Sequence, residues 1–202
     1  MIKNILFDLG AVLVKYDWRA YAEKKFEDKR VSDAVYDSLI CHHVWDEMDR
    51  GVWSDEKIRE TFVSFHPEYR KEILLALDEA GLDLQRFDYT VDWINSLKER
   101  GFKIYYLSNW SHQIFDNCGD TLDFLSLMDG GVFSWKEKVI KPEPEIYNIL
   151  LDRYGLVADE CVFFDDREKN ARGADAVGIH GVTFTDYDLA CEKLERIIEE
   201  NR

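Results

Sequence analysis

Residues 2–10 read IKNILFDLG. The apolar run from Ile2 to Phe7 is rich in β-branched and aromatic side chains, and it ends at Asp8-Leu9-Gly10. A short apolar run that is bounded in this way is typical of a buried strand that ends in a loop. The N-terminus is therefore predicted to form a core strand with a carboxylate at its end.

Two later segments follow the same pattern. The run FKIYYL stops at Ser108-Asn109, and the run CVFF stops at Asp165-Asp166. Apolar residues at helical spacing lie before the second strand and at the C-terminus. Because predicted strands alternate with predicted helices, we expect an α/β fold built on a parallel sheet.

The length limits the number of domains. At 202 residues and 46% hydrophobic composition, the chain can bury one sizeable core and carry a small subdomain. Residues 17–81 show no convincing strand, only helical segments with Gly51 and Pro67 as breaks. We therefore expect a core of residues 1–16 and 82–202, with an all-helical cap of residues 17–81 inserted after the first strand.

Charge and cysteine content exclude several kinds of partner. The chain has 41 acidic and 26 basic residues, and its formal net charge of -15 repels nucleic acid and anionic lipid. The four cysteines are far apart and form no CxxC pair, so neither a disulfide framework nor a structural zinc site is indicated. The apolar N-terminus is too short to span a membrane and lacks a cleavage pattern. We expect a cytoplasmic protein with no nucleic-acid or membrane partner.

Polar side chains follow all three predicted strands. The carboxyl ends of parallel strands line one crevice of a doubly wound sheet, so Asp8 and Ser108 can meet there although they are far apart in sequence. Lys141 precedes Pro142 and a helix-like stretch that runs to Tyr154. Because proline suits the first helical turn, we expect Lys141 at the mouth of this helix, facing an anionic substrate.

These residue types suit phosphoryl transfer. Asp8 and Asp166 are the expected ligands of Mg²⁺, which prefers hard oxygen donors and leaves positions open for phosphate oxygens. Lys141 would offset the charge of the phosphoryl group, while Ser108 and Asn109 hold its remaining oxygens. Attack by Asp8 would give an aspartyl-phosphate that water hydrolyses. The predicted function is a magnesium-dependent phosphatase acting on a small phosphorylated metabolite.

Four segments, FDLGAVLV, YYLSN, VIKPEPEIY and VFFDDREKNARGADAVGI, resemble the four motifs of the haloacid dehalogenase (HAD) superfamily in order and spacing. More narrowly, they resemble its sugar-phosphatase branch, which includes alpha-D-glucose-1-phosphate phosphatase. The resemblance implies a Rossmann-like core with a helical cap. It also implies that Asp8 is nucleophile and metal ligand, that Gly10 offers its backbone carbonyl to the metal, and that Asp166 completes the protein ligands. Asp165 and Asn170 would support the metal site.

One position departs from the family pattern. Phosphatases of the superfamily usually carry an aspartate two residues after the nucleophile, as general acid for the leaving group, and this chain has Gly10 there. A leaving oxygen that departs easily depends less on protonation. We therefore expect a preference for anomeric or acyl phosphates. Asp17, or a water held by the cap, is a possible substitute for the missing acid.

Several other residues are weaker candidates for the site. His42 and His43 are interpreted as cap residues without chemistry, because adjacent side chains diverge on a helix or strand. Trp110, two residues after Ser108, is a candidate for contacting a sugar, with core packing as the alternative. Residues 49–51 (DRG) lie where the family often places a specificity loop, and a plain helix connection is the simpler interpretation.

Three alternatives stay open. A dehalogenase attacks carbon and needs no metal, and the retained Asp165-Asp166 pair argues against it. A phosphomutase would depend more heavily on the acid that is missing at Gly10. A low-activity member that binds a phosphorylated ligand or a protein partner is the third alternative, and Gly10 is the residue that favours it.

Overall fold

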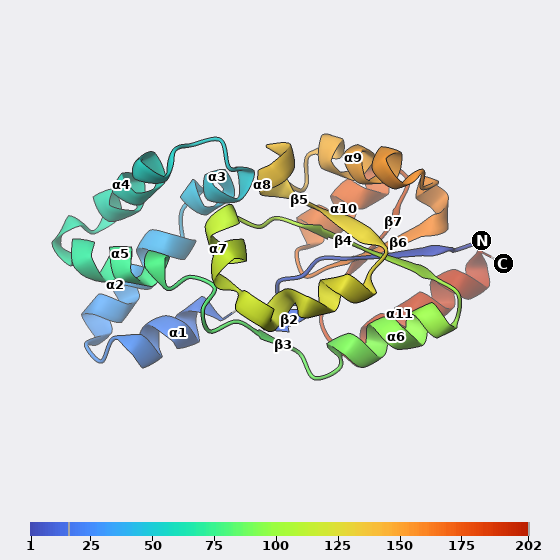
Figure 1. Cartoon of the computed structure of the whole chain (residues 1–202), viewed down its shortest axis with the longest axis horizontal. Helices are drawn as coiled ribbons and strands as arrows, with labels where there is room; N and C mark the ends of the chain where they lie inside the picture. The colour runs from blue at the N-terminus through green and yellow to red at the C-terminus, as the bar shows by residue number, and fades with distance from the viewer. Residues whose placement is uncertain (16, 202) are drawn as a thin grey trace.

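A computed structural model describes residues 1–15 and 17–201 (Figure 1). Its main sheet has five parallel strands in the order β5-β4-β1-β6-β7. The strands are β1 (Asn4–Phe7), β4 (Lys103–Ser108), β5 (Gly130–Phe133), β6 (Cys161–Asp165) and β7 (His180–Thr183). The three strands expected from the sequence are the three central ones, and the predicted α/β class with a parallel sheet is confirmed.

The two edge strands were not predicted. Both are short and contain glycine, so neither forms an apolar run. In β5 the glycine has a packing reason, because the Tyr106 ring on β4 lies against Gly131 and leaves no room for a Cβ atom. A second, two-stranded antiparallel sheet pairs β2 (Val14–Lys15) with β3 (Gln85–Arg86).

Helices cover both faces of the main sheet (Figure 1). On one face lie α6 (Thr90–Glu99) and α11 (Tyr187–Glu200), and on the other lie α9 (Pro144–Tyr154) and α10 (Glu168–Ala176). Successive strand residues point to opposite faces. Phe7 therefore packs against Trp93 of α6, with ring centroids 4.7 Å apart, whereas Leu6 joins the cluster that contains Tyr147 of α9.

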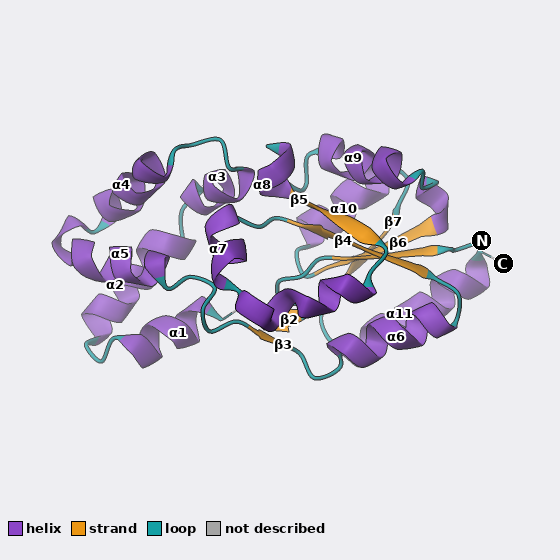
Figure 2. Cartoon of the chain, in the orientation of Figure 1, coloured by secondary structure: helices purple, strands orange, loops and turns teal. Residues whose placement is uncertain are grey.

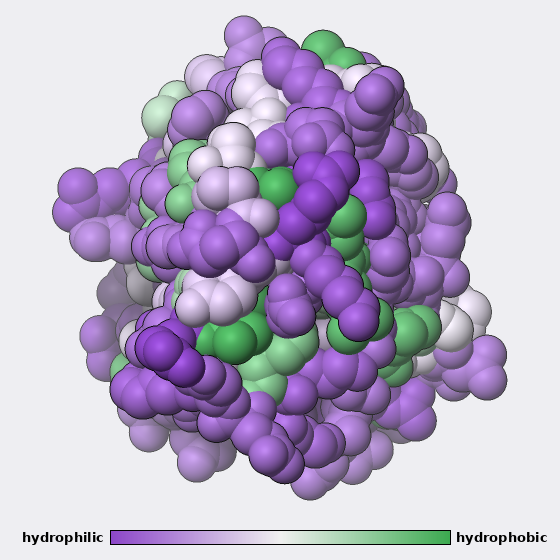
Figure 3. All heavy atoms as spheres, turned by 90° about the vertical axis from the view of Figure 1, so that its left-hand side faces the viewer, coloured by the Kyte–Doolittle hydropathy of each residue, from purple (hydrophilic) through white to green (hydrophobic). Residues whose placement is uncertain are grey.

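Residues 17–81, all of them described, form helices and no strand. They are α1 (Trp18–Lys25), α2 (Lys29–Ile40), α3 (Val44–Arg50), α4 (Asp55–Phe65) and α5 (Arg70–Asp78), with a 3₁₀ turn at Pro67–Tyr69. Figure 2 shows these helices together at one end of the molecule, away from the sheet. Hydrophilic side chains cover most of that end, and apolar groups show only between them (Figure 3). We call residues 17–81 the helical segment; its treatment as a separate cap stays a prediction, and residue 16, at the predicted boundary, lies outside the described residues.

Local sequence explains the breaks between these helices. Gly51 ends α3 in the left-handed conformation (φ 67°), which a glycine adopts at little cost. Ser54 caps α4 by accepting a hydrogen bond from the Lys57 N–H at 3.3 Å. Pro67 begins the 3₁₀ turn.

The remaining helices are short. They are α7 (His112–Asn117), α8 (Ser134–Glu137) and two 3₁₀ segments, Gly119–Leu127 and Ala158–Glu160. Within residues 1–15 and 17–201, none of the helices combines the length and apolar character needed to cross a membrane.

Candidate active site

The site lies where β1, β4 and β6 end side by side. Asp8 directly follows β1, Ser108 is the last residue of β4, and Asp165 is the last residue of β6. The Asp8 N–H donates to the Phe164 carbonyl at 2.8 Å, which holds the turn against β6. The chain fills the sheet on one side of β1 and then on the other, so Asp8 stands at the topological switch point where α/β folds bind ligands.

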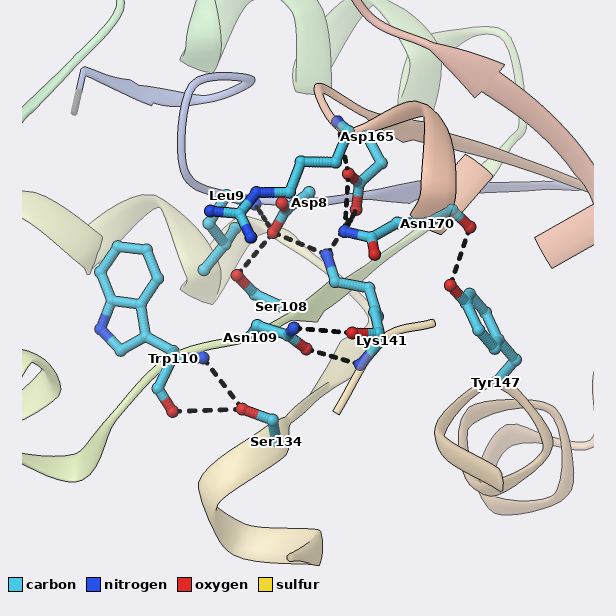
Figure 4. Close-up of polar contacts among 11 residues, drawn as sticks. Asp8, Leu9, Ser108, Asn109, Trp110, Ser134, Lys141, Tyr147, Asp165 and Asn170 are labelled. Carbon is cyan, nitrogen blue, oxygen red and sulfur yellow. Dashed lines mark hydrogen bonds and ion pairs between the residues drawn. The ribbon is translucent and has the colours of Figure 1, made fainter. Parts of the chain in front are cut away.

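Three donors converge on one oxygen of Asp8 (Figure 4). Its Oδ1 accepts from Ser108 Oγ at 2.6 Å and from the Leu9 N–H at 2.7 Å, and it lies 3.0 Å from Lys141 Nζ. Within the described part of the chain, no hydrogen bond reaches Oδ2. The carboxylate thus keeps one oxygen for a ligand or substrate.

Electrostatics set the protonation of Asp8. Burial raises its pKa to about 7, Lys141 opposes that rise, and the neighbouring Asp165 and Asp166 carboxylates add to it. The Ser108 hydrogen bond lowers the pKa again by stabilising the ionised form. Three carboxylates close together therefore need a compensating cation.

Lys141 is the cation that contacts two of these carboxylates. Its side chain is 0% exposed, and its Nζ lies 2.6 Å from Asp165 Oδ2 as well as 3.0 Å from Asp8. Burial alone would lower the pKa of Lys141, but the charges of Asp165 and Asp8 outweigh burial and raise it. Lys141 therefore stays charged between two buried carboxylates.

The approach to Lys141 differs from the sequence-based expectation. The helix begins at Pro144, and Pro142 lies in the turn before it, so the placement of Pro142 in the first helical turn was wrong. The Asn109 side chain fixes this turn instead. Its Oδ1 accepts from the Lys141 N–H at 2.8 Å and its Nδ2 donates to the Lys141 carbonyl at 3.1 Å, because both backbone groups precede the helix and need partners.

Asp165 is held by several donors. It is fully buried and accepts hydrogen bonds from Asn170 Nδ2 at 2.9 and 3.1 Å and from the Arg167 N–H at 2.8 Å. Asn170 is itself only 2% exposed, so it does not lie on the helix surface, and its carbonyl accepts from the Tyr147 hydroxyl at 2.8 Å. The conformation of Asp165 is thereby set by the turn after β6 and by α10, which Tyr147 of α9 contacts at Asn170.

Asp8, Asp165 and Asp166 form an acidic cluster in which one oxygen from each lies within 4.8 Å of the others. Asp166 is exposed, and burial of part of the side chain together with the charge of Asp165 raises its pKa. Since both oxygens of Asp165 already receive donors, Asp8 and Asp166 are the carboxylates that could hold a cation. Such an all-oxygen donor set suits Mg²⁺.

A cavity of about 480 Å³ opens above the cluster, between the strand ends and the helical segment. Asp8, Gly10 and Asp166 form part of its floor, and a Cβ atom at Gly10 would find its nearest neighbour, the Trp110 ring, 4.0 Å away. Trp110 is 4% exposed and lines the cavity, so it serves core packing and the cavity wall at once. Arg167, which directly follows the acidic pair, also lines the cavity and was missed in the sequence.

The helical segment supplies the opposite wall. It contributes aromatic, imidazole and acidic side chains, namely Trp18, Tyr36, His43, Trp45, Asp46 and Asp49. His42 also reaches the cavity, but its ring stacks on Phe65 and its Nε2 lies 3.3 Å from Asp37. Asp17, the sequence-based candidate for a substitute acid, is exposed and uses Oδ1 to cap α1 through the Ala20 N–H at 2.9 Å.

Known proteins share this architecture. Residues 2–178 match the family model of haloacid dehalogenase-like hydrolases. The chain is 25% identical to a sesquiterpene phosphatase of Aspergillus oryzae, covering 97% of this chain and 96% of that protein, and 25% identical to a D-ribitol-5-phosphate phosphatase of Bacteroides thetaiotaomicron, covering 84% and 85%. It shares its fold with a HAD family enzyme of Bacteroides thetaiotaomicron solved with magnesium and inorganic phosphate, at a TM-score of 0.67 and 23% identity over 92% of this chain and 95% of that one. The chain is a hydrolase that belongs to the haloacid dehalogenase-like family.

Proposed function

We propose that this hydrolase is a magnesium-dependent phosphatase of small phosphorylated metabolites, with Asp8 as its nucleophile. One observation carries the proposal: Ser108 and the buried Lys141 contact Asp8 Oδ1 (Figure 4), and an oxygen of Asp166 lies within 4.8 Å of an Asp8 oxygen. The phosphatase relatives support the substrate class. The retained acidic pair disfavours a dehalogenase, which needs no metal.

The residues present fit the metal. Asp8, Asp166 and the backbone carbonyl of Gly10 would hold Mg²⁺. Asp165, which Asn170 holds, would support Asp8 through Lys141, because Lys141 Nζ contacts both carboxylates. Magnesium bound there supplies positive charge against the phosphoryl oxygens.

The protein groups then account for the two halves of the reaction. The Asp8 carboxylate attacks phosphorus, and the charge of Lys141 reduces the repulsion between this carboxylate and the anionic phosphoryl group. The Ser108 hydroxyl and the Asn109 backbone N–H would hold phosphoryl oxygens. Water then attacks the aspartyl-phosphate and releases Asp8.

The cavity indicates the size and polarity of the substrate. About 480 Å³ accommodates a small phosphorylated molecule, and walls that mix aromatic rings with polar groups suit a sugar. Gly10 places no acid on the loop beside the nucleophile, so protonation of the leaving oxygen depends on a group farther away. This favours an anomeric phosphate, because an anomeric oxygen leaves more readily than a primary alcohol and depends less on that group. The helical segment, acting as a cap, would close over this leaving group and exclude larger ones.

A metal-binding prediction needs no turnover. Adding MgCl₂ at about 100 times its dissociation constant should stabilise the protein by about 2.7 kcal/mol. For a chain of this length that corresponds to a rise of about 5–10 °C in melting temperature. Asp166→Asn should remove most of this shift, whereas Asp159→Asn, which changes an acidic residue outside the cluster, should keep it. Equal shifts in both variants would contradict the ligand assignment.

A substrate comparison tests the function itself. We expect phosphate release from an aryl phosphate and from glucose 1-phosphate in the presence of magnesium, with loss of release on chelation. Glucose 6-phosphate, which carries the same sugar, should react at least about tenfold more slowly in kcat/KM, a barrier difference of about 1.4 kcal/mol. If none of the three compounds releases phosphate with magnesium, the alternative of a low-activity member that only binds a ligand or partner is favoured. Faster turnover of glucose 6-phosphate than of glucose 1-phosphate would refute the anomeric preference.

A further inference from the structure

Asp49 is a buried acid on the wall of the cavity, opposite the acidic cluster. It belongs to α3, its side chain lines the same cavity as Asp8, and the residue is 5% exposed. Its Oδ1 receives no hydrogen bond from any of the described residues. Buried polar atoms nearly always have a partner, so an exception at a ligand cavity points to a partner that arrives with the ligand.

The backbone of Asp49 is bonded to residues that follow the sheet strands, next to the predicted phosphate site. Ser134 Oγ donates to the Asp49 carbonyl at 2.7 Å and accepts from the Trp110 N–H at 2.9 Å. Figure 4 shows Ser134 beside Trp110, which follows Ser108-Asn109. One hydroxyl therefore connects the helical segment to the loop that would hold the phosphoryl group.

The two residues after Asp49 strengthen this attachment. The Arg50 guanidinium forms two hydrogen bonds with the Glu143 carboxylate, and Lys138 Nζ donates to the Gly51 carbonyl at 2.7 Å. The stretch 49–51 is thus bound to the core at three consecutive residues. It is more than a helix connection, and it holds Asp49 in a defined position at the cavity.

The surroundings of Asp49 favour its protonated form. Burial raises its pKa well above the usual range of an aspartate, and the nearby Asp46 carboxylate raises it further. Arg167 lowers the pKa, Asp8 raises it, and Lys141 lowers it, in decreasing order of influence. A carboxyl in this setting can carry a proton at a pH at which an exposed aspartate has lost it.

We propose that Asp49 is the general acid and base of this enzyme, supplied by the helical segment in place of the side chain that Gly10 lacks. The inference rests on the proposed phosphatase function and names the group that handles the leaving oxygen. Asp17 is a weaker candidate, because it is exposed and caps α1.

The proton balance of the two steps is complete. As an Asp8 oxygen bonds to phosphorus, the bond from phosphorus to the leaving oxygen breaks, and that oxygen keeps the electron pair and takes the proton of Asp49. In the second step a water oxygen bonds to phosphorus, the Asp49 carboxylate takes a proton from that water, and the bond from phosphorus to Asp8 breaks. Asp49 ends protonated and Asp8 ionised, ready for the next ester.

The test compares leaving groups in Asp49→Asn, which preserves shape and removes the proton donor. Because kcat/KM reports the steps up to formation of the aspartyl-phosphate, it isolates the acid role. We expect kcat/KM with magnesium to fall about 10²- to 10⁴-fold for glucose 6-phosphate. It should fall less for glucose 1-phosphate and by under about tenfold for an aryl phosphate, whose leaving oxygen needs little protonation.

The matched control is Asp78→Asn, because Asp78 belongs to α5 of the same helical segment, forms an exposed ion pair with Arg59 and does not line the cavity. It should leave the ratio of the three kcat/KM values unchanged. As a second variant, Asp49→Ala should regain turnover of glucose 6-phosphate when formate is added, since formate can occupy the vacated space and donate the proton. This rescue keeps the test decisive if the asparagine variant folds poorly.

Equal losses on all three substrates, no loss on the sugar phosphates, or a changed ratio in Asp78→Asn instead would overturn the assignment. A failure of the proposed function looks different, because the parent protein would then release no phosphate from any substrate with magnesium.

Discussion

Asp8→Asn is expected to lower phosphate release by at least about 10⁴-fold, the usual scale for removal of a covalent nucleophile. The amide has nearly the same shape as the carboxylate, and its oxygen can still accept from Ser108 and Leu9. It cannot attack phosphorus, and it is a weaker ligand for a cation. The measurement is turnover of an aryl phosphate with magnesium, which depends least on the acid.

A second readout identifies the covalent step. Rapid acid quenching during turnover should trap a phosphoryl group on the peptide that contains Asp8. The asparagine variant should trap none. In a separate single-turnover experiment in water enriched in a heavy oxygen isotope, the Asp8 carboxylate of the parent should stay unlabelled, because water attacks phosphorus and not the carboxyl carbon. Asp123→Asn, at an exposed ion pair with Arg86, is the control for loss of one negative charge and should behave as the parent. Turnover of Asp8→Asn within about tenfold of the parent would exclude Asp8 as nucleophile.

The residues at the centre of the candidate site could be predicted from the sequence, because the patterns that indicate them are local. Each central strand is a run of buried apolar residues that ends in a polar side chain, and parallel strands bring such ends together. The sequence alone therefore places Asp8, Ser108 and Asp165 at the carboxyl-terminal edge of the sheet. The edge strands β5 and β7 could not be found in this way, because they contain glycines whose role is to admit a neighbouring ring or backbone.

Contacts between segments that are distant in the sequence could not be predicted from it. Nothing near Asn109 in sequence shows that its amide pairs with the backbone of Lys141, and nothing near Asp49 shows that Ser134 holds its carbonyl. In the sequence, residues 49–51 are most simply interpreted as a helix connection, and nothing there distinguishes Asp49 from the other acidic residues of the segment. Burial and an unsatisfied oxygen distinguish it, and both depend on the packing of the helical segment against the sheet domain.

Lys141→Met should destabilise the fold by about 3–5 kcal/mol, the usual cost of removing one partner of a buried ion pair. Lys141 is fully buried between Asp165 and Asp8, so its loss leaves two carboxylates without their cation. Methionine keeps the apolar stem of the side chain, which limits the effect of lost packing. Chemical unfolding at neutral pH without magnesium measures the change in the free energy of unfolding.

The matched control is Lys103→Met, which removes an exposed lysine 2.9 Å from Asp129 and should cost about 1 kcal/mol or less. Combining Lys141→Met with Asp165→Asn removes one of the two carboxylates left unpaired. The double variant should therefore be less destabilised than the sum of the single changes, by about 0.5–3 kcal/mol of coupling. A Lys141 variant no less stable than the Lys103 control would mean that water already screens this pair. In that case Lys141 could not be the desolvated cation that allows the Asp8 carboxylate to approach a phosphoryl anion.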